Sequence, residues 1–201
     1  MTHYFKNSEN LPHNRKEIAF RFLGIYHTFD VDDGVFSKTK PDDGSLLLVE
    51  NVLKQNIQGK VLDLGSGYGL ISLLLKRHLP ELQVVAYEVN ERAVECAKRT
   101  AQRMKLDLDF RNQDVMFGVE GQYDVVVTNP PIRAGKQVVY AFFDLANKHL
   151  VKDGCLFVVI RRQQGAASAM KALQLRFETV ERIALHKGFE VIKACKPLTL
   201  D

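Results

Sequence analysis

Three glycines stand between a predicted strand and a predicted helix in the segment VLDLGSGYGL, residues 61–70. Because Gly65, Gly67 and Gly69 lack a Cβ, the backbone can turn tightly there and a ligand can approach it closely. A dinucleotide-binding fingerprint places its third glycine five residues after the first, and that position is Leu70 in this chain. The turn therefore favours a nucleoside ligand without a pyrophosphate.

Acidic side chains surround this turn in the sequence. Glu88 ends the next predicted strand, 23 residues after Gly65, where an acid can accept both hydroxyls of a ribose. Asp114 follows the third predicted strand and could accept the exocyclic amine of an adenine, while Asp63 could orient a cationic amino group, directly or through water. With Ser66 inside the turn, these residues suit adenosine joined to a positively charged amino acid, since the acids would repel a pyrophosphate. The alternative is a simple tight turn flanked by solvated acids.

A second motif, Asn129-Pro130-Pro131, follows the predicted strand Tyr123–Thr128. The two prolines fix the backbone and are expected to leave their carbonyls without competing local amides. The Asn129 side-chain oxygen and the Pro130 carbonyl could each accept one hydrogen of a flat amino group and so aim its nitrogen lone pair at an electrophile. Taken alone, the motif is equally typical of a strand that ends in a loop.

The charges are only mildly unbalanced, with a net charge of +4. Several cations nevertheless follow predicted strands or lie in the loop after the N-terminal hairpin, so they are expected to form a rim around the same crevice. Such a rim would hold the phosphates of an RNA, and Phe36 is a candidate for stacking on a base. The alternative is a set of solvated loop cations. The rim residues are Lys38, Arg133, Lys136, Arg161 and Arg162.

The composition disfavours several other classes of protein. The apolar clusters among the 201 residues are too short to span a bilayer, and the polar stretch Met1 to Lys16 lacks the apolar core of an export signal. Cys96, Cys155 and Cys195 show no metal-ligand spacing, so no metal is expected, and we interpret them as buried small hydrophobic residues of a cytoplasmic protein. The oligomeric state is open.

The elements that must position these residues alternate along most of the chain. A hairpin is expected over 17–23 and 25–30, followed by a loop at 34–38. A helix is then expected to begin within residues 42–45 and to end at Leu53. Further helices are expected at 70–78, after Asn90, at 138–149 and at 166–177, with a turn at 152–154. The expected strands of the sheet are 61–64, 84–88, 106–111, 123–128, 155–160, 180–185 and 189–194.

This alternation predicts an α/β fold with a doubly wound, mostly parallel seven-stranded sheet that ends in an antiparallel hairpin. Near-continuous apolar strands are typical of a sheet covered on both faces. We expect one domain over residues 1–201, in which 1–40 is an extension and 41–201 is the catalytic core. The ligand crevice of such a sheet lies at the carboxyl ends of its strands.

Together these motifs resemble class I S-adenosylmethionine-dependent methyltransferases. The segments Gly34 to Ser37, Asp43 to Ser45 and Asn129 to Lys136 are similar to the small-domain family that includes ribosomal small-subunit guanine-N2 methyltransferases. The resemblance implies S-adenosylmethionine as cofactor and ribosomal RNA or the small subunit as partner. Many amine methyltransferases carry an aromatic residue where this chain has Ile132. Methylation of a protein glutamine or a small-molecule amine, and cofactor binding without catalysis, remain alternatives.

Overall fold

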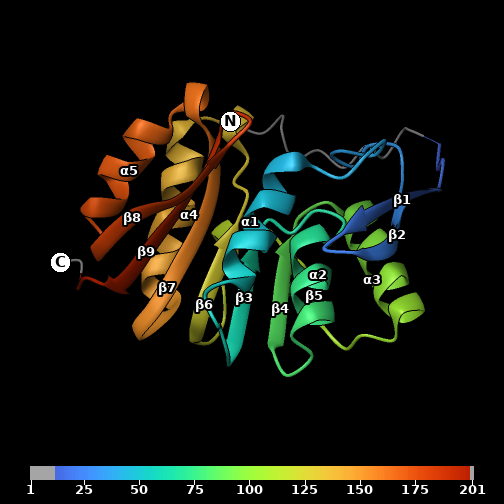
Figure 1. Ribbon diagram of the computed structural model, residues 1–201, viewed down its shortest axis with the longest axis horizontal. Helices are drawn as coiled ribbons and strands as arrows, with labels where there is room; N and C mark the ends of the chain where they lie inside the picture. Colours follow the sequence, from blue (N-terminus) through green and yellow to red (C-terminus); the bar gives the residue numbers. More distant parts are fainter. Residues whose placement is uncertain (1–11, 200–201) are drawn as a thin grey trace.

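The computed structural model describes residues 12–199. Seven strands lie side by side in the order β5-β4-β3-β6-β7-β9-β8 (Figure 1). The first five along the chain pair in parallel, and the last two add antiparallel pairs at one edge. The expected doubly wound sheet with its C-terminal hairpin is confirmed. The strands are β3 (Lys60–Leu64), β4 (Gln83–Glu88), β5 (Asp109–Asn112), β6 (Tyr123–Thr128), β7 (Leu150–Arg161), β8 (Phe177–His186) and β9 (Phe189–Pro197).

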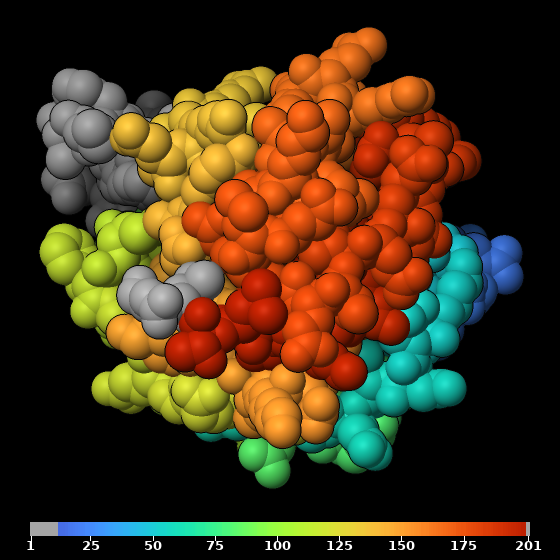
Figure 2. Space-filling view, turned by 90° about the vertical axis from the view of Figure 1, so that its left-hand side faces the viewer, coloured from blue at the N-terminus to red at the C-terminus, as the bar shows by residue number. Residues whose placement is uncertain are grey.

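Helices cover both faces of this sheet. Alternate strand residues point to opposite sides, so Val61 and Val125 pack in one hydrophobic cluster, and Leu62 and Val126 in the other. At the end of the sheet that carries β8, helix α5 lies at the surface (Figure 2). One face holds α1 (Asp43–Leu53), α2 (Leu70–His78) and α3 (Glu91–Met104), and the other holds α4 (Lys136–His149) and α5 (Ala166–Gln174).

The N-terminal hairpin forms a separate two-stranded sheet of β1 (Lys16–Phe22) and β2 (Ile25–Val31). Its turn is Leu23-Gly24, with both residues at positive φ, as a two-residue hairpin turn requires. The hairpin lies against α3 (Figure 1), where the backbone N–H of Asp30 donates to Thr100 Oγ1 at 2.9 Å. The predicted hairpin is therefore present and is anchored to the main sheet's helical layer.

Three predicted element boundaries are wrong. The expected strand 106–111 begins only at Asp109, because the N–H of Leu106 bonds the carbonyl of Ala101 and closes the end of α3. The expected turn at 152–154 lies inside β7. Between the pairs Tyr123–Leu150 and Val125–Cys155, four residues of β7 lie opposite a single residue of β6, and the longer strand bulges there. The last helix ends at Gln174, and Phe177 already begins β8.

The interpretation of all three cysteines as buried small hydrophobic residues is wrong for two of them, which are only partly buried. Cys155 and Cys195 lie opposite each other in the antiparallel pair β7–β9 and form a disulfide. Their separation of 40 residues in the chain hid this pairing. Only Cys96 is a free thiol within the described residues, and burial raises its pKa to about 12.

Within residues 12–199, no helix is both long enough and apolar enough to span a membrane. The expectation that the protein is not exported was based on residues 1–16. Most of this segment, residues 1–11, lies outside the described residues.

Candidate functional site

A cavity of about 720 Å³ lies at the carboxyl ends of the parallel strands. Its wall contains the glycine turn after β3, Glu88 from the end of β4, Asp114 after β5 and Asn129 after β6. Parallel strands present their carboxyl ends at the same edge, which brings these four segments together although they span 65 residues of sequence. The volume falls in the range of small-molecule and cofactor sites.

The glycine turn is fastened to the neighbouring strand and open toward the cavity. The N–H groups of Gly65 and Ser66 both donate to the carbonyl of Tyr87, each at 3.0 Å. Gly67 has a φ of +56°, and a Cβ built on it would meet no atom within 4 Å. The turn therefore presents bare backbone to the cavity at Gly67, as the sequence predicts.

Glu88 is held in a defined orientation at the cavity wall. Its carboxylate accepts the N–H of Gly67 and the N–H of Asn90, each at 2.8 Å. Burial raises the pKa of Glu88, and the nearby charge of Asp114 adds to this effect. Asp114 lines the same wall and accepts the N–H of Met116 at 2.9 Å. Both acids therefore lie where a nucleoside in the cavity could reach their free lone pairs.

Asp63 lies elsewhere. It is fully buried beneath the turn, does not belong to the cavity wall, and accepts a hydrogen bond from the hydroxyl of Ser72 in α2. Burial raises the pKa of Asp63 to about 7, an effect that the bond from Ser72 partly offsets. Asp63 therefore joins β3 to α2 through one carboxylate oxygen, while its other oxygen, Oδ1, has no hydrogen-bond partner within residues 12–199. Its expected role of orienting a cationic amino group, directly or through water, stays a prediction.

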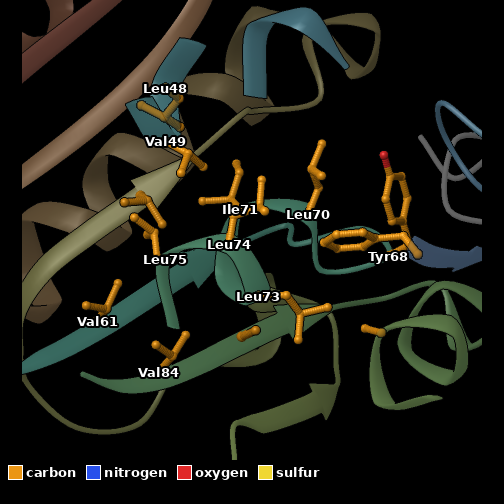
Figure 3. Close-up of a cluster of buried hydrophobic side chains, with 14 of the residues drawn as sticks. Leu48, Val49, Val61, Tyr68, Leu70, Ile71, Leu73, Leu74, Leu75 and Val84 are labelled. Carbon is orange, nitrogen blue, oxygen red and sulfur yellow. The ribbon is translucent and has the colours of Figure 1, made fainter. Parts of the chain in front are cut away.

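Two buried hydroxyls in the cavity wall have no hydrogen-bond partner within residues 12–199. They belong to Ser66 and Tyr68. Figure 3 shows the Tyr68 ring beside the Leu70 side chain of α2, with the hydroxyl at the free end of the ring, and burial raises the pKa of this phenol. Because buried polar atoms are normally hydrogen-bonded, these hydroxyls fit a polar ligand such as the adenosine and amino-acid groups of S-adenosylmethionine.

Asn129 is joined to the start of α1. Its side-chain nitrogen donates to Asp42 Oδ2 and to Ser45 Oγ, each at 3.0 Å. Asp42 is the N-cap of α1 and also accepts the N–H of Ser45 at 2.7 Å. This arrangement leaves the Asn129 side-chain oxygen for another donor.

The expectation that the proline carbonyls lack local donors is wrong. The chain turns into the short helix η2 (Ile132–Ala134), so the N–H of Ile132 donates to the carbonyl of Pro130 at 2.8 Å. The carbonyl of Pro131 likewise accepts the N–H of Ala134 at 2.9 Å. A carbonyl oxygen has two lone pairs, so Pro130 can still accept one further hydrogen.

Two of the five predicted rim cations and the candidate stacking residue Phe36 reach the cavity. Phe36, Arg133 and Arg161 line it, and Phe36 is 67% exposed. The Arg161 guanidinium lies 4.3 Å from the centroid of the Phe189 ring, which belongs to the same wall. The other three cations lie outside the wall and have their own contacts: Lys38 with Asp33, Lys136 with the Tyr140 ring, and Arg162 with Glu190.

Sequence analysis missed four residues of this site. Asp42 and Ser45 were expected only as helix caps, and their contact with Asn129 joins positions more than 80 residues apart. Tyr68 lies inside the glycine motif but was given no role there, and Phe189 lines the cavity without a charge or motif that would have marked it. The capping pattern before residues 46–49 marked Asp42 and Ser45, and the segment Asp43 to Ser45 also contributed to the family resemblance. No cluster of three or more potential metal ligands occurs within residues 12–199.

A family model described as "Methyltransferase small domain" matches residues 26–193. The chain belongs to this methyltransferase family. The match covers the second strand of the hairpin, the glycine turn, the Asn-Pro-Pro segment and nearly all of the C-terminal hairpin. The family resemblance inferred from the sequence is confirmed.

Individual relatives agree with this assignment. The Bacillus subtilis protein YbxB is 36% identical over 96% of this chain and 98% of its own length. Ribosomal RNA small subunit methyltransferase C of Photobacterium profundum is 34% identical over 90% of this chain and 53% of its own. A T. thermophilus 16S rRNA N2 methyltransferase, RsmC, solved with AdoMet and guanosine, superposes with a TM-score of 0.82 at 29% identity.

The chain spans about half the length of these ribosomal RNA methyltransferases. It covers 53% of the P. profundum enzyme and 52% of the T. thermophilus structure, against 92% of its own residues in the latter case.

Proposed function

We propose that this chain is an S-adenosylmethionine-dependent N-methyltransferase whose target is an exocyclic amine of RNA, guanine N2 of small-subunit ribosomal RNA. The carrying observation is that Gly67 and Asn129, from segments far apart in the chain, line one cavity. The cofactor supplies a methyl group on a sulfonium. The chain's own residues would hold that cofactor on one side and a flat amine on the other.

On the cofactor side, the carboxylate of Glu88 would accept the ribose hydroxyls and Asp114 the adenine amine. Backbone donors already orient both acids. The free hydroxyls of Ser66 and Tyr68 would bond the polar groups of the amino-acid portion.

On the amine side, the Asn129 side-chain oxygen and the second lone pair of the Pro130 carbonyl would each accept one N–H of the target. Holding both hydrogens points the nitrogen lone pair toward the cofactor. Such orientation can lower a barrier by roughly 7–11 kcal/mol in the best cases. No strong base is required beside the amine, because its proton can pass to water after transfer.

RNA as the substrate is supported by the cavity rim and by the relatives. Arg133 and Arg161 provide positive charge at the cavity mouth, and the exposed ring of Phe36 offers a surface for a base. Two of the relatives are named as small-subunit ribosomal RNA methyltransferases. A ribosomal substrate would place the protein in the cytoplasm.

Transfer of a labelled methyl group from S-adenosylmethionine to undermethylated small ribosomal subunits tests the proposal. We expect label in the RNA, recovered after digestion as N2-methylguanosine. Label in glutamine of a ribosomal protein would instead favour the protein-methylating alternative. Absence of label from both RNA and protein would contradict the proposed function.

The Asn129 side-chain oxygen and the Pro130 carbonyl together form the proposed amine clamp, and replacing Asn129 tests it. We expect Asn129→Ala to lower kcat by about 100-fold or more, because the target nitrogen loses one of its two acceptors, while the Kd for S-adenosylmethionine stays unchanged. Kinetics and calorimetry measure the two quantities.

Asn147→Ala is the matched control, because the Asn147 amide also donates two hydrogen bonds, at 2.7 and 3.0 Å, but in α4 and away from the cavity. This control should lose stability and keep its kcat. Wild-type turnover by Asn129→Ala would refute the clamp.

A further inference from the structure

The Asn129 carboxamide is held by acceptors that are themselves fixed. Asp42 Oδ2 accepts three hydrogen bonds: from the Asn129 amide at 3.0 Å, from the Ser45 N–H at 2.7 Å and from the Ser45 hydroxyl at 3.0 Å. The Ser45 hydroxyl therefore donates its hydrogen to Asp42 and accepts the hydrogen bond from the Asn129 amide. Both partners of the Asn129 nitrogen are thus acceptors.

This arrangement has a consequence for the amide orientation. An ionised carboxylate can only accept hydrogen bonds, so a flipped Asn129 would place its oxygen against the Asp42 oxygen with no proton between them. The amide nitrogen must face α1, and the oxygen must face elsewhere. No donor within residues 12–199 contacts that oxygen.

Close packing brings the start of α1 to this position. Gly44 lies between Asp42 and Ser45, and a Cβ on it would lie 2.7 Å from the Phe189 ring. The absence of a side chain at Gly44 therefore lets the first turn of α1 pack against β9 beside the clamp. Asp42, Ser45, Asn129 and Phe189 all line the same cavity.

We propose that Asp42, supported by Ser45, is a positioning residue that fixes the rotamer of Asn129 so that its oxygen is presented to the target amine. This inference rests on the proposed amine methylation. Asp42 does not touch the substrate in this scheme, and it acts through Asn129.

Asp42→Asn is the decisive variant. Asparagine is as good an N-cap as aspartate, so α1 keeps its cap, but an amide can donate as well as accept and no longer forces the orientation of Asn129. We expect kcat to fall by about 10- to 100-fold, as for a reacting group misplaced by about 1 Å. The KM for the ribosomal substrate, the Kd for S-adenosylmethionine and the melting temperature should change little. Ser45→Ala, which removes one of the two acceptors, should cause a smaller loss of kcat.

A double-mutant cycle separates positioning from a purely structural role. In the Asn129→Ala background, Asp42→Asn should cause no further loss of kcat, because the amide that it positions is gone. Val52→Ala is a destabilising control in the same helix: Val52 is fully buried, is not part of the cavity wall, and should affect melting temperature without affecting kcat.

The possible failures are distinct. An active wild type with unchanged kcat in Asp42→Asn, or an equal loss of kcat in both backgrounds, would overturn the positioning role and leave the proposed function intact. A wild-type protein that methylates no amine in RNA or protein would overturn the proposed function and, with it, this inference.

Discussion

Gly67 and Gly24 have comparable backbones and different surroundings. Their φ angles are +56° and +84°, in the left-handed region that residues with a Cβ avoid, and a Cβ on either would meet no atom within 4 Å. The space beside Gly67 belongs to the cavity, whereas Gly24 lies in the hairpin turn. The two glycines therefore separate the effect of backbone strain from the effect of filling the cofactor site.

Gly67→Ala is expected to weaken S-adenosylmethionine binding by about 10-fold or more, because a methyl group enters the cavity where the cofactor would lie against backbone. The left-handed conformation should also cost about 1–2 kcal/mol of unfolding free energy. Gly24→Ala should show a similar loss of stability with an unchanged Kd. Calorimetric titration and urea unfolding measure both, and cofactor affinity unaltered by Gly67→Ala would contradict the assignment of this turn.

The hairpin β1–β2 is attached to the core by aromatic and polar contacts. The fully buried Phe29 ring meets Tyr68 of the glycine turn edge-on, with ring centroids 6.0 Å apart. His27 is also buried, and its ring centroid lies 6.1 Å from that of His78 at the end of α2. The hairpin therefore contacts the glycine turn through Phe29 and the end of α2 through His27.

This histidine pair predicts a pH dependence of stability. Burial lowers the pKa of His27, the charges of His78 and Arg77 lower it further, and a backbone hydrogen bond at Phe22 partly offsets this shift. Burial also lowers the pKa of His78, and the charge of Arg77 adds to that effect. Both pKa values are therefore below the value of about 6.5 for an unfolded chain. The unfolded state binds more protons in this range, so the histidine contribution to stability is complete above about pH 6.5 and declines as the pH falls.

His27→Leu should reduce the fall in unfolding free energy between pH 7.5 and pH 5.5, measured by urea denaturation. His186→Gln, at an exposed position in the C-terminal hairpin, should keep the wild-type slope. A slope unchanged by His27→Leu would show that the buried imidazole does not contribute.

On the scale of the whole molecule, the disulfide joins the parallel part of the sheet to its antiparallel edge. Cys155 of β7 and Cys195 of β9 are separated by 40 residues, which include α5 and β8. Restricting a loop of this length in the unfolded chain is worth about 4 kcal/mol in the chain-entropy model. The bridge therefore stabilises the edge that carries Phe189 beside the cavity.

Reductant and Cys155→Ser should each lower the unfolding free energy by up to about 4 kcal/mol. The variant should then be insensitive to reductant, which serves as the internal control. Thiol titration of the unfolded, unreduced wild type should find one thiol, that of Cys96. Three titrating thiols would show that Cys155 and Cys195 are unpaired.

The sequence alone determined the order and type of most elements. Strand and helix patterns are local, so Leu70–His78 and Tyr123–Thr128 have the predicted bounds. The rule that parallel strands present their carboxyl ends at one edge brought Gly67, Glu88 and Asn129 together, although the spatial order of the strands was not predicted. Periodicity reports burial and not hydrogen bonding, however, so the bulge within β7 and the early end of α5 were missed.

Only the tertiary structure decided which side chains meet. Packing between distant segments brings together two pairs, Cys155 with Cys195 and Asn129 with Asp42. A local sequence pattern does not indicate which distant residues will be in contact. The same holds for Asp63: nothing in its motif indicated that the packing of α2 on β3 would bring the Ser72 hydroxyl to its carboxylate. Chemistry-bearing residue types can be recognised along a chain, whereas their orientation depends on contacts that form only when the chain folds.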